Sequence, residues 1–220
     1  MNCVKKLLQI AYNDVRIQAF LRQIKELRYE TYIHSLSVAS LSAILGCQMK
    51  LSDDEIIDLI KGALLHDYGK IYIAEDILLK PSTLSEAEYE IVKDHSLFGY
   101  NIVKNYFNDN ISAIVRDHHE KLNGIGYPFG EQNISLLTQI VTVCDIYDAL
   151  TKRDTYKELY NNSKAFKILY ADANRGEINA NIIDVLSFVA RQKCDLWLWD
   201  GIIPLESKGG EEYGIRRYAN

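Results

Sequence analysis

The chain has 220 residues, of which 48% are apolar, and it carries a formal net charge of −5 at pH 7. This length suits one large domain with short extensions, and 12 glycines and three prolines are too few for a collagen-like or disordered chain. The mild negative charge argues against DNA as a partner, and no stretch approaches the ~20 apolar residues of a membrane span.

Helical periodicity dominates the first third of the chain. Residues 3–26 carry apolar side chains at steps of three and four positions, which predicts a helix, and a second helix is expected at about 30–47. Ser52 and Glu55 have the spacing of a capping box, in which serine and glutamate bond to each other's backbone N–H groups. A third helix is therefore expected to begin there.

The rest of the chain is also predicted to be helical. A second capping-box pattern, Ser85 with Glu88, opens a helix expected to run to about Tyr106. Further helices are expected near residues 111–119, 135–151, 163–172 and 180–193. Strand signals are sparse and short. The predicted fold is therefore all-α, with one helical bundle over 26–195, an N-terminal helical extension over 1–25 and a C-terminal tail over 196–220.

Three stretches depart from the helical pattern. Residues 71–84 are expected to form an ordered loop, and residues 120–134 form a second loop that is rich in glycine. Loops on a rigid scaffold commonly carry function. In the tail, Trp197 and Trp199 are expected to pack back on their own domain rather than to bind a partner.

The cysteines indicate a reducing compartment. Cys3, Cys47, Cys144 and Cys194 form no CxxC pair and none lies near a histidine at zinc-finger spacing. We therefore expect free thiols in a cytoplasmic protein. The short apolar run after Lys6 is too interrupted for a signal peptide.

The five histidines occur beside carboxylates or beside one another. Glu30 precedes His34 by one helical turn, and Asp67 directly follows His66 at the end of an apolar helix. The remaining three are His95, His118 and His119, and two aspartates, Asp145 and Asp148, interrupt a later apolar helix. A lone histidine of this kind is usually structural, but so many buried polar groups together are costly without a shared counter-charge.

A site holding more than one metal ion removes this cost. Imidazoles mixed with carboxylates, and without cysteine, suit iron or manganese better than a structural zinc ion. Two such ions can activate water and clamp a phosphate, which predicts hydrolysis of phosphoesters.

Four ordered segments carry a family resemblance. Residues 64–70 (LLHDYGK) resemble the HD motif of the HD phosphohydrolase superfamily, and residues 118–128 (HHEKLNGIGYP) resemble the motif that defines its HD-GYP subgroup. Residues 95–99 (HSLFG) and 143–151 (VCDIYDALT) are similar to two further segments of that subgroup. The resemblance covers about residues 30–157 and implies hydrolysis of cyclic di-GMP, a bacterial second messenger, to pGpG, GMP or both.

The resemblance also implies a ligand set for two or three divalent ions, iron or manganese. Its metal positions fall on Glu30, His34, His66, Asp67, His95, His118, His119 and Asp145. In this family a glutamate at the position of Glu30 accompanies a third ion, so a trinuclear site is expected. The alternative for Glu30 is an exposed helix residue.

Catalytic and substrate roles follow from the same resemblance. Asp67 is expected to bridge two metals, with a hydroxide between them attacking phosphorus, and Lys70 is expected to contact the phosphate. The expected substrate contacts are Lys70, Gly124, Gly126, Tyr127, Pro128, Asp148, Arg153 and Lys157. The loop of Tyr127 is alternatively a purely structural one.

The chain departs from the family pattern after residue 151. The usual arginine is shifted by one position to Arg153, Asp154 takes its place, and Thr155 replaces proline, whereas Lys157 is where it is expected. One helical position turns a side chain by ~100°, so the preference among dinucleotides is open.

Three functions follow. The first is a cyclic di-GMP phosphodiesterase; the second is a phosphohydrolase of 3′,3′-cyclic GMP-AMP or of a mononucleotide. The third is a non-catalytic module that binds cyclic di-GMP or a diguanylate cyclase. Expected partners are the cyclic dinucleotide and, for regulation, a second copy of the chain or a sensor or cyclase protein.

Overall fold

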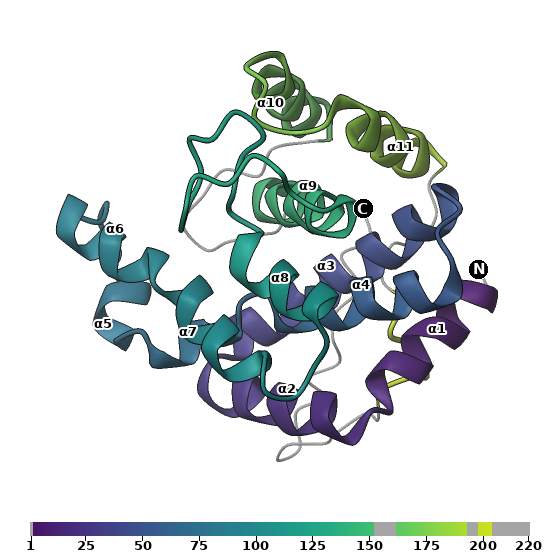
Figure 1. The fold of residues 1–220 in the computed structure, drawn as a ribbon, viewed down its shortest axis with the longest axis horizontal. Helices are drawn as coiled ribbons and strands as arrows, with labels where there is room; N and C mark the ends of the chain where they lie inside the picture. The colour runs from purple at the N-terminus through teal and green to yellow at the C-terminus, as the bar shows by residue number, and fades with distance from the viewer. Residues whose placement is uncertain (1, 152–161, 193–197, 204–220) are drawn as a thin grey trace.

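The computed structural model describes residues 2–151, 162–192 and 198–203, and helices joined by loops make up its architecture (Figure 1). Within them the sole β feature is an isolated bridge between Asp200 and Ile203, so the all-α prediction is confirmed. No helix in the described part of the chain is long and apolar enough to cross a membrane. The α-helices are α1 (Asn2–Tyr12), α2 (Val15–Leu27), α3 (Tyr29–Gln48), α4 (Asp53–Leu65), α5 (Glu75–Leu78), α6 (Glu86–Lys93), α7 (His95–Val103), α8 (Asp109–Asp117), α9 (Leu136–Thr151), α10 (Asn162–Asn174) and α11 (Ala180–Arg191), and η1 (Tyr68–Tyr72) is a short 3₁₀ helix.

Helices α3, α4, α8 and α9 form the centre of the bundle, with α10 and α11 beside α9 (Figure 1). Helix α3 is buried almost continuously from Ser35 to Gly46, and many of these residues are small. Small side chains let α4 approach closely, since a Cβ added to Gly46 would lie 3.1 Å from a methyl of Leu59. The centre of the fold is therefore rigid enough to fix side chains that project from it.

The predicted helix over 3–26 is two helices. Asp14 interrupts it with an extended backbone (φ −63°, ψ 118°) and caps α2 by accepting the N–H of Arg16 at 3.0 Å. A capping carboxylate stabilises this break better than a continued helix would. Both helices bury apolar residues in the common core, among them Leu8, Ile17 and Ile24.

The predicted helix from Ser85 to Tyr106 is also interrupted, at Asp94. The capping box of Ser85 and Glu88 is present, so the start of α6 is confirmed. Part of the predicted loop over 71–84 is helical, because η1 extends into it and α5 lies within it. None of the residues of α5 or α6 is buried, and the two helices extend from the body of the fold (Figure 1).

One tryptophan of the C-terminal tail packs on the bundle. Trp199 is 1% exposed, and its indole N–H donates to the carbonyl of Leu36 at 2.7 Å. This matches the expectation that the tail aromatics pack on their own domain. Trp197 lies outside the described residues.

Candidate metal centre

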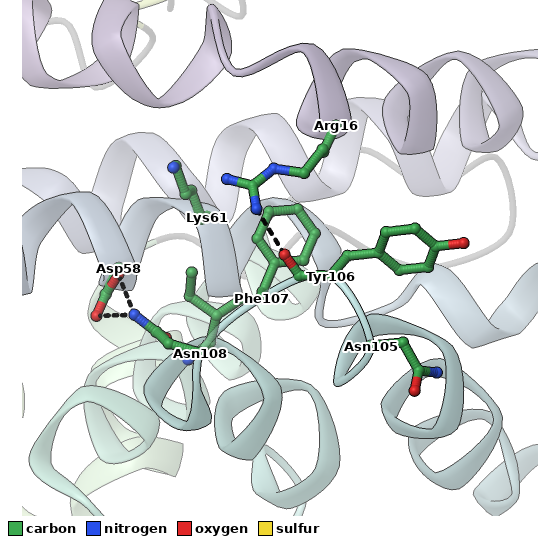
Figure 2. Close-up of a pocket in the computed structure, with 8 residues that line it drawn as sticks. Arg16, Asp58, Lys61, Asn105, Tyr106, Phe107 and Asn108 are labelled. Atoms are coloured by element: carbon green, nitrogen blue, oxygen red, sulfur yellow. Dashed lines mark hydrogen bonds between the residues drawn. The ribbon is translucent and has the colours of Figure 1, made fainter.

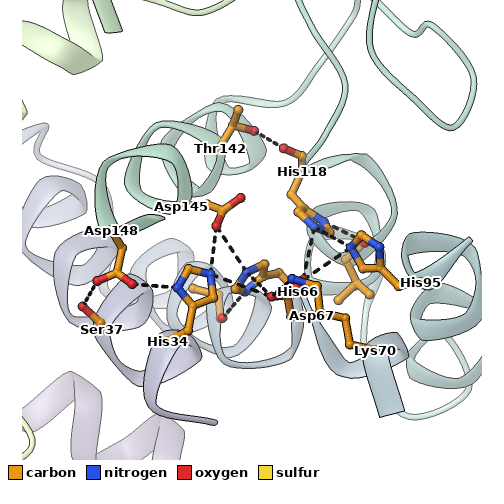
Figure 3. Close-up of polar contacts among 12 residues, drawn as sticks. His34, Ser37, His66, Asp67, Lys70, His95, His118, Thr142, Asp145 and Asp148 are labelled. Carbon is orange, nitrogen blue, oxygen red and sulfur yellow. Dashed lines mark hydrogen bonds and ion pairs between the residues drawn. The ribbon is translucent and has the colours of Figure 1, made fainter. Parts of the chain in front are cut away.

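Seven of the predicted metal ligands meet at the centre of the bundle, and Figure 3 labels all of them except His119. They form two groups, in each of which the candidate ligand atoms lie within 4.8 Å of one another. The first group is Asp67, His95, His118 and His119, and the second is His34, His66 and Asp145. These residues come from α3, the end of α4, the start of α7, the end of α8, and α9. Packing of these helices therefore assembles the site.

Asp67 lies between the two groups and faces each with a different oxygen. Its Oδ1 is 3.4 Å from Nε2 of His95 and 3.9 Å from Nε2 of His118. Its Oδ2 is 3.5 Å from Nε2 of His66 and 3.8 Å from Nε2 of His34. A carboxylate placed in this way can bridge two cations.

The backbone fixes three of the imidazole rings. Nδ1 of His66, His95 and His118 donates to the carbonyl three residues earlier, at 2.8, 2.6 and 3.0 Å respectively. This bond assigns the ring proton to Nδ1 and leaves the lone pair of Nε2 directed at the centre. Figure 3 also shows the hydroxyl of Thr142 on α9 donating to the His118 carbonyl, at 2.8 Å.

These orientations suit a cation. The Nε2 atoms of His95 and His118, both with lone pairs directed inward, are 3.3 Å apart. Among the described residues, Nε2 of His66 and Oδ1 of Asp67 are buried without a hydrogen-bond partner. Burial lowers the pKa of His95 to about 4 and that of His119 to about 3, so both rings are neutral at pH 7. Neutral imidazoles and buried carboxylates are ligands for divalent first-row metals.

His34 is oriented by carboxylates instead of by a carbonyl. Its Nδ1 donates to Asp148 at 2.6 Å and its Nε2 donates to Asp145 at 2.8 Å. Burial opposes the charged ring, but these two bonds outweigh it and raise the pKa of His34 to about 9. The other oxygen of Asp148 accepts the hydroxyl of Ser37 (Figure 3). Asp148, predicted as a substrate contact, thus lies 7% exposed behind His34 with both oxygens engaged.

Lys70 occupies the position expected of a catalytic lysine. Its ammonium is 2.6 Å from Oδ2 of Asp67. Burial opposes the charge on Lys70, but the carboxylates of Asp67 and Asp145 raise its pKa above the ordinary value. Lys70 is therefore a fixed positive charge at the edge of the two ligand groups.

The predicted glycine-rich loop lies against the first group. The Tyr127 ring stacks on the His119 ring, with centroids 4.7 Å apart and an angle of 26° between the planes. Gly124 has φ +80°, a conformation that favours glycine. A Cβ on Gly126 would lie 2.5 Å from Cα of Glu120, so the loop folds back against the backbone of the residue that follows His119. Pro128 follows Tyr127 through a cis peptide bond.

The sequence interpretation missed Glu120 as a site residue. Its side chain is 1% exposed, and its two oxygens accept the backbone N–H groups of Phe129 at 2.6 Å and Glu131 at 3.0 Å. Glu120 therefore clamps the loop that carries Tyr127. The sequence carries no clear signal for this role, because acidic residues beside loops are ordinarily solvated.

The remaining predicted residues lie outside the two groups. Glu30 is exposed on α3, one turn before His34, and belongs to neither group. Arg153 and Lys157 lie outside the described residues. The trinuclear expectation and the contacts of these two basic residues therefore stay predictions.

A separate cavity of about 300 Å³ lies where α2, α4 and the start of α8 meet (Figure 2). Its polar groups bond to one another: Arg16 donates to the carbonyl of Tyr106 at 2.7 Å, and Asn108 donates to both oxygens of Asp58. None of its lining residues belongs to the two ligand groups. This cavity is a junction between helices.

Comparisons with known proteins identify a family for this chain. The family model described as "HD domain" matches residues 31–150. A cyclic di-GMP phosphodiesterase of Pseudomonas aeruginosa is 37% identical over 143 residues, which is 62% of this chain and 34% of that protein. A 3′3′-cGAMP-specific phosphodiesterase of Vibrio cholerae is 35% identical over 165 residues, which is 74% of this chain and 36% of that protein.

A solved structure supports the fold. An HDG"Y"P protein from Bdellovibrio bacteriovorus superposes with a TM-score of 0.61 at 24% identity, over 72% of this chain and 51% of that one. The chain spans about a third of the length of the two curated relatives.

Proposed function

Because this chain belongs to the HD domain family, we propose that it is a metal-dependent phosphodiesterase of cyclic dinucleotides, with cyclic di-GMP as the first candidate. The resemblance seen in the sequence motifs is thereby confirmed at the level of the family. The observation that carries the proposal is Asp67, whose two oxygens face two separate groups of imidazole and carboxylate side chains. Relatives named for cyclic di-GMP hydrolysis support the substrate.

The two groups would hold one divalent cation each, with Asp67 shared between them. Cations held there would act as Lewis acids on a phosphoryl oxygen and would lower the pKa of an attacking water. The chain's own side chains would orient the substrate and the ligands and balance the charge of the phosphate. Lys70 is placed to neutralise a non-bridging phosphate oxygen, and Tyr127, stacked on His119, forms a wall of the site. Asp148 holds His34 in position from behind.

Turnover tests this function directly. The full chain, prepared without oxygen and loaded with Mn(II) or Fe(II), is incubated with cyclic di-GMP, the products are separated by chromatography, and metals are counted on the same sample. We expect loss of cyclic di-GMP and formation of pGpG, GMP or both. Binding without turnover in a fully loaded sample would instead support the non-catalytic module.

We propose that iron or manganese occupies the site and that Glu30 supports a third ion. Imidazole and carboxylate ligands suit these metals. Glu30→Ala is expected to lower the metal content by one ion per chain, whereas replacement of Glu26, an exposed glutamate near the end of α2, by alanine leaves it unchanged. An unchanged count in Glu30→Ala would reduce the site to two ions.

The second candidate substrate is 3′,3′-cyclic GMP-AMP. A relative named for specificity toward it is 35% identical to this chain, a value close to that of the first cyclic di-GMP relative. The shifted Arg153 leaves the preference between the two open. Parallel measurement of kcat/KM on both dinucleotides decides it, and the larger value identifies the substrate.

Location and protein partners complete the proposal. We place the protein in the bacterial cytoplasm, where cyclic dinucleotides are made and read. A second copy of the chain, a sensor or a cyclase would supply regulation. Sedimentation of the purified chain with and without cyclic di-GMP tests the homodimer.

A further inference from the structure

Lys93 stands at the last position of α6, on the part of the fold that extends from the body (Figure 1). Its ammonium lies over the ring of Tyr127, 5.6 Å from the centroid, and over the ring of Tyr89 at 5.0 Å. Tyr127 in turn stacks on His119 at 4.7 Å. The distance from the Lys93 ammonium to the His119 ring centroid is therefore at most the sum of the 5.6 Å and 4.7 Å distances.

The position of Lys93 relative to the ligand groups is fixed by the backbone. The carbonyl of the preceding residue, Val92, accepts Nδ1 of His95 at 2.6 Å. The same short connection from α6 to α7 therefore orients a candidate metal ligand and presents Lys93 at the rim. A lysine elsewhere on the surface would not be held in a fixed position relative to the candidate metal ligands.

The charge of Lys93 is available to a ligand. Lys93 forms an ion pair with Glu90 at 2.6 Å, and the Glu90 side chain is 65% exposed. Ion pairs between exposed side chains contribute little, so a phosphate can replace the carboxylate. Lys93 is itself 27% exposed, partly covered by the two aromatic rings.

A cyclic dinucleotide presents two phosphodiesters on one macrocycle. The phosphate that reacts is met by Lys70 and the two ligand groups, and the other phosphate, one nucleoside away, needs a cation of its own. We propose that Lys93 binds this second phosphate and so selects cyclic dinucleotides over simple phosphodiesters. This inference rests on the proposed function.

The test compares two substrates on the Mn(II)-loaded full chain: cyclic di-GMP, and bis(p-nitrophenyl) phosphate, which has one phosphodiester. Lys93→Met keeps the length of the side chain and removes its charge. We expect it to lower kcat/KM for cyclic di-GMP, mainly through KM, by at least about tenfold more than for the one-phosphate substrate. Lys93→Arg is expected to recover most of the loss.

Lys104→Met is the matched control, because Lys104 also lies over a tyrosine, 4.9 Å from the Tyr100 centroid, but at the far end of α7. It is expected to leave both substrates unaffected. Equal losses on both substrates in Lys93→Met, or no loss on either, would overturn the assignment of Lys93 alone. A wild-type chain that hydrolyses the one-phosphate substrate and no cyclic dinucleotide would overturn the proposed substrate and the assignment together.

Discussion

At the scale of single residues, Glu120 makes its contribution through two backbone bonds. It accepts the N–H groups of Phe129 and Glu131, and the loop between Glu120 and Phe129 carries Tyr127, which stacks on His119. Because Glu120 is outside both ligand groups, its loss is expected to move Tyr127 without removing metal. Activity and metal content can therefore be separated experimentally.

We predict that Glu120→Gln lowers kcat/KM about tenfold and Glu120→Ala about a hundredfold. A hydrogen bond to a charged group contributes about 1.5–3 kcal/mol, and Gln keeps one of the two acceptor interactions. The measurements are kinetics on cyclic di-GMP and metals per chain. Glu131→Gln is the control, since this exposed carboxylate also accepts a loop N–H, from Asn133 at 2.7 Å. Loss of metal from Glu120→Gln would refute a role limited to the loop.

The sequence identified residues whose chemistry is unusual for their position. Histidines and aspartates inside apolar helices signal a shared counter-charge, and His34, His66 and Asp145 do meet. It did not identify Glu120 or Lys93, because acidic and basic residues near loops are ordinarily solvated. Their roles depend on which backbone atoms and rings the fold brings beside them, which no local pattern encodes.

At the scale of elements, two glycines let η1 and α7 touch. A Cβ on Gly69 would lie 1.9 Å from the carbonyl oxygen of His95 and 2.7 Å from the backbone nitrogen of Gly99. Both obstacles are backbone, so a side chain here forces the two elements apart. His95 would then move away from Asp67.

We predict that Gly69→Ala costs about 3 kcal/mol or more of unfolding free energy, because overpacking against backbone has no cheap relaxation. Gly99→Ala is the graded comparison: its Cβ would first meet a Val115 methyl at 2.9 Å, a side-chain atom that can shift. Its cost is expected to be smaller. Urea unfolding monitored by circular dichroism measures both, and equal costs would contradict the argument.

Element boundaries show what the sequence leaves undetermined. Periodicity predicted single helices over 3–26 and from Ser85 to Tyr106, yet Asp14 and Asp94 interrupt them. Apolar spacing continues through both breaks. Helices α1 and α2 both contribute to the core, whereas α6 buries none of its residues. Both capping boxes, Ser52 with Glu55 and Ser85 with Glu88, could be recognised as helix starts, whereas the cap at Asp14 was not recognised.

Asp14 ties the first break to α4. Besides capping α2, it pairs with Arg16 at 2.7 Å and with Lys61 of α4 at 2.8 Å. The hydrogen bond from Arg16, and then that from Lys61, hold the pKa of Asp14 well below its ordinary value against the effect of burial. A lowered carboxyl pKa stabilises the fold above the ordinary pKa of 3.8, and the contribution is lost as the pH falls below it.

We predict that Asp14→Ala costs about 1–2 kcal/mol at pH 7, since it removes the cap and the charge. Asp14→Asn keeps a capping oxygen and is expected to cost less. The difference between wild type and Asp14→Asn should be constant above about pH 5 and shrink below pH 4. Denaturant unfolding at a series of pH values measures this difference. A difference at pH 3 that is as large as the difference at pH 7 would show that charge is not the cause.

At the scale of the whole molecule, the packing that forms the core also assembles the site. The seven ligands come from segments spread between His34 and Asp145, so they meet only when the bundle is complete. Because several of these groups are buried, the fold carries their desolvation cost. Cations bound to both groups would offset that desolvation cost. They would bind the folded chain in preference to the unfolded one.

Metal removal is therefore expected to lower stability. At a free Mn(II) concentration of 100 times Kd, one site adds about 2.7 kcal/mol, and a second adds to it. Thermal unfolding after chelation, and again over a Mn(II) series, should show a midpoint that rises with metal. Asp67→Ala removes the shared carboxylate and is expected to abolish most of the rise, whereas Glu131→Gln, exposed on the loop, keeps it. A midpoint in wild type that does not respond to Mn(II) would mean that the two groups do not bind this ion, because any ligand selective for the folded state must raise it.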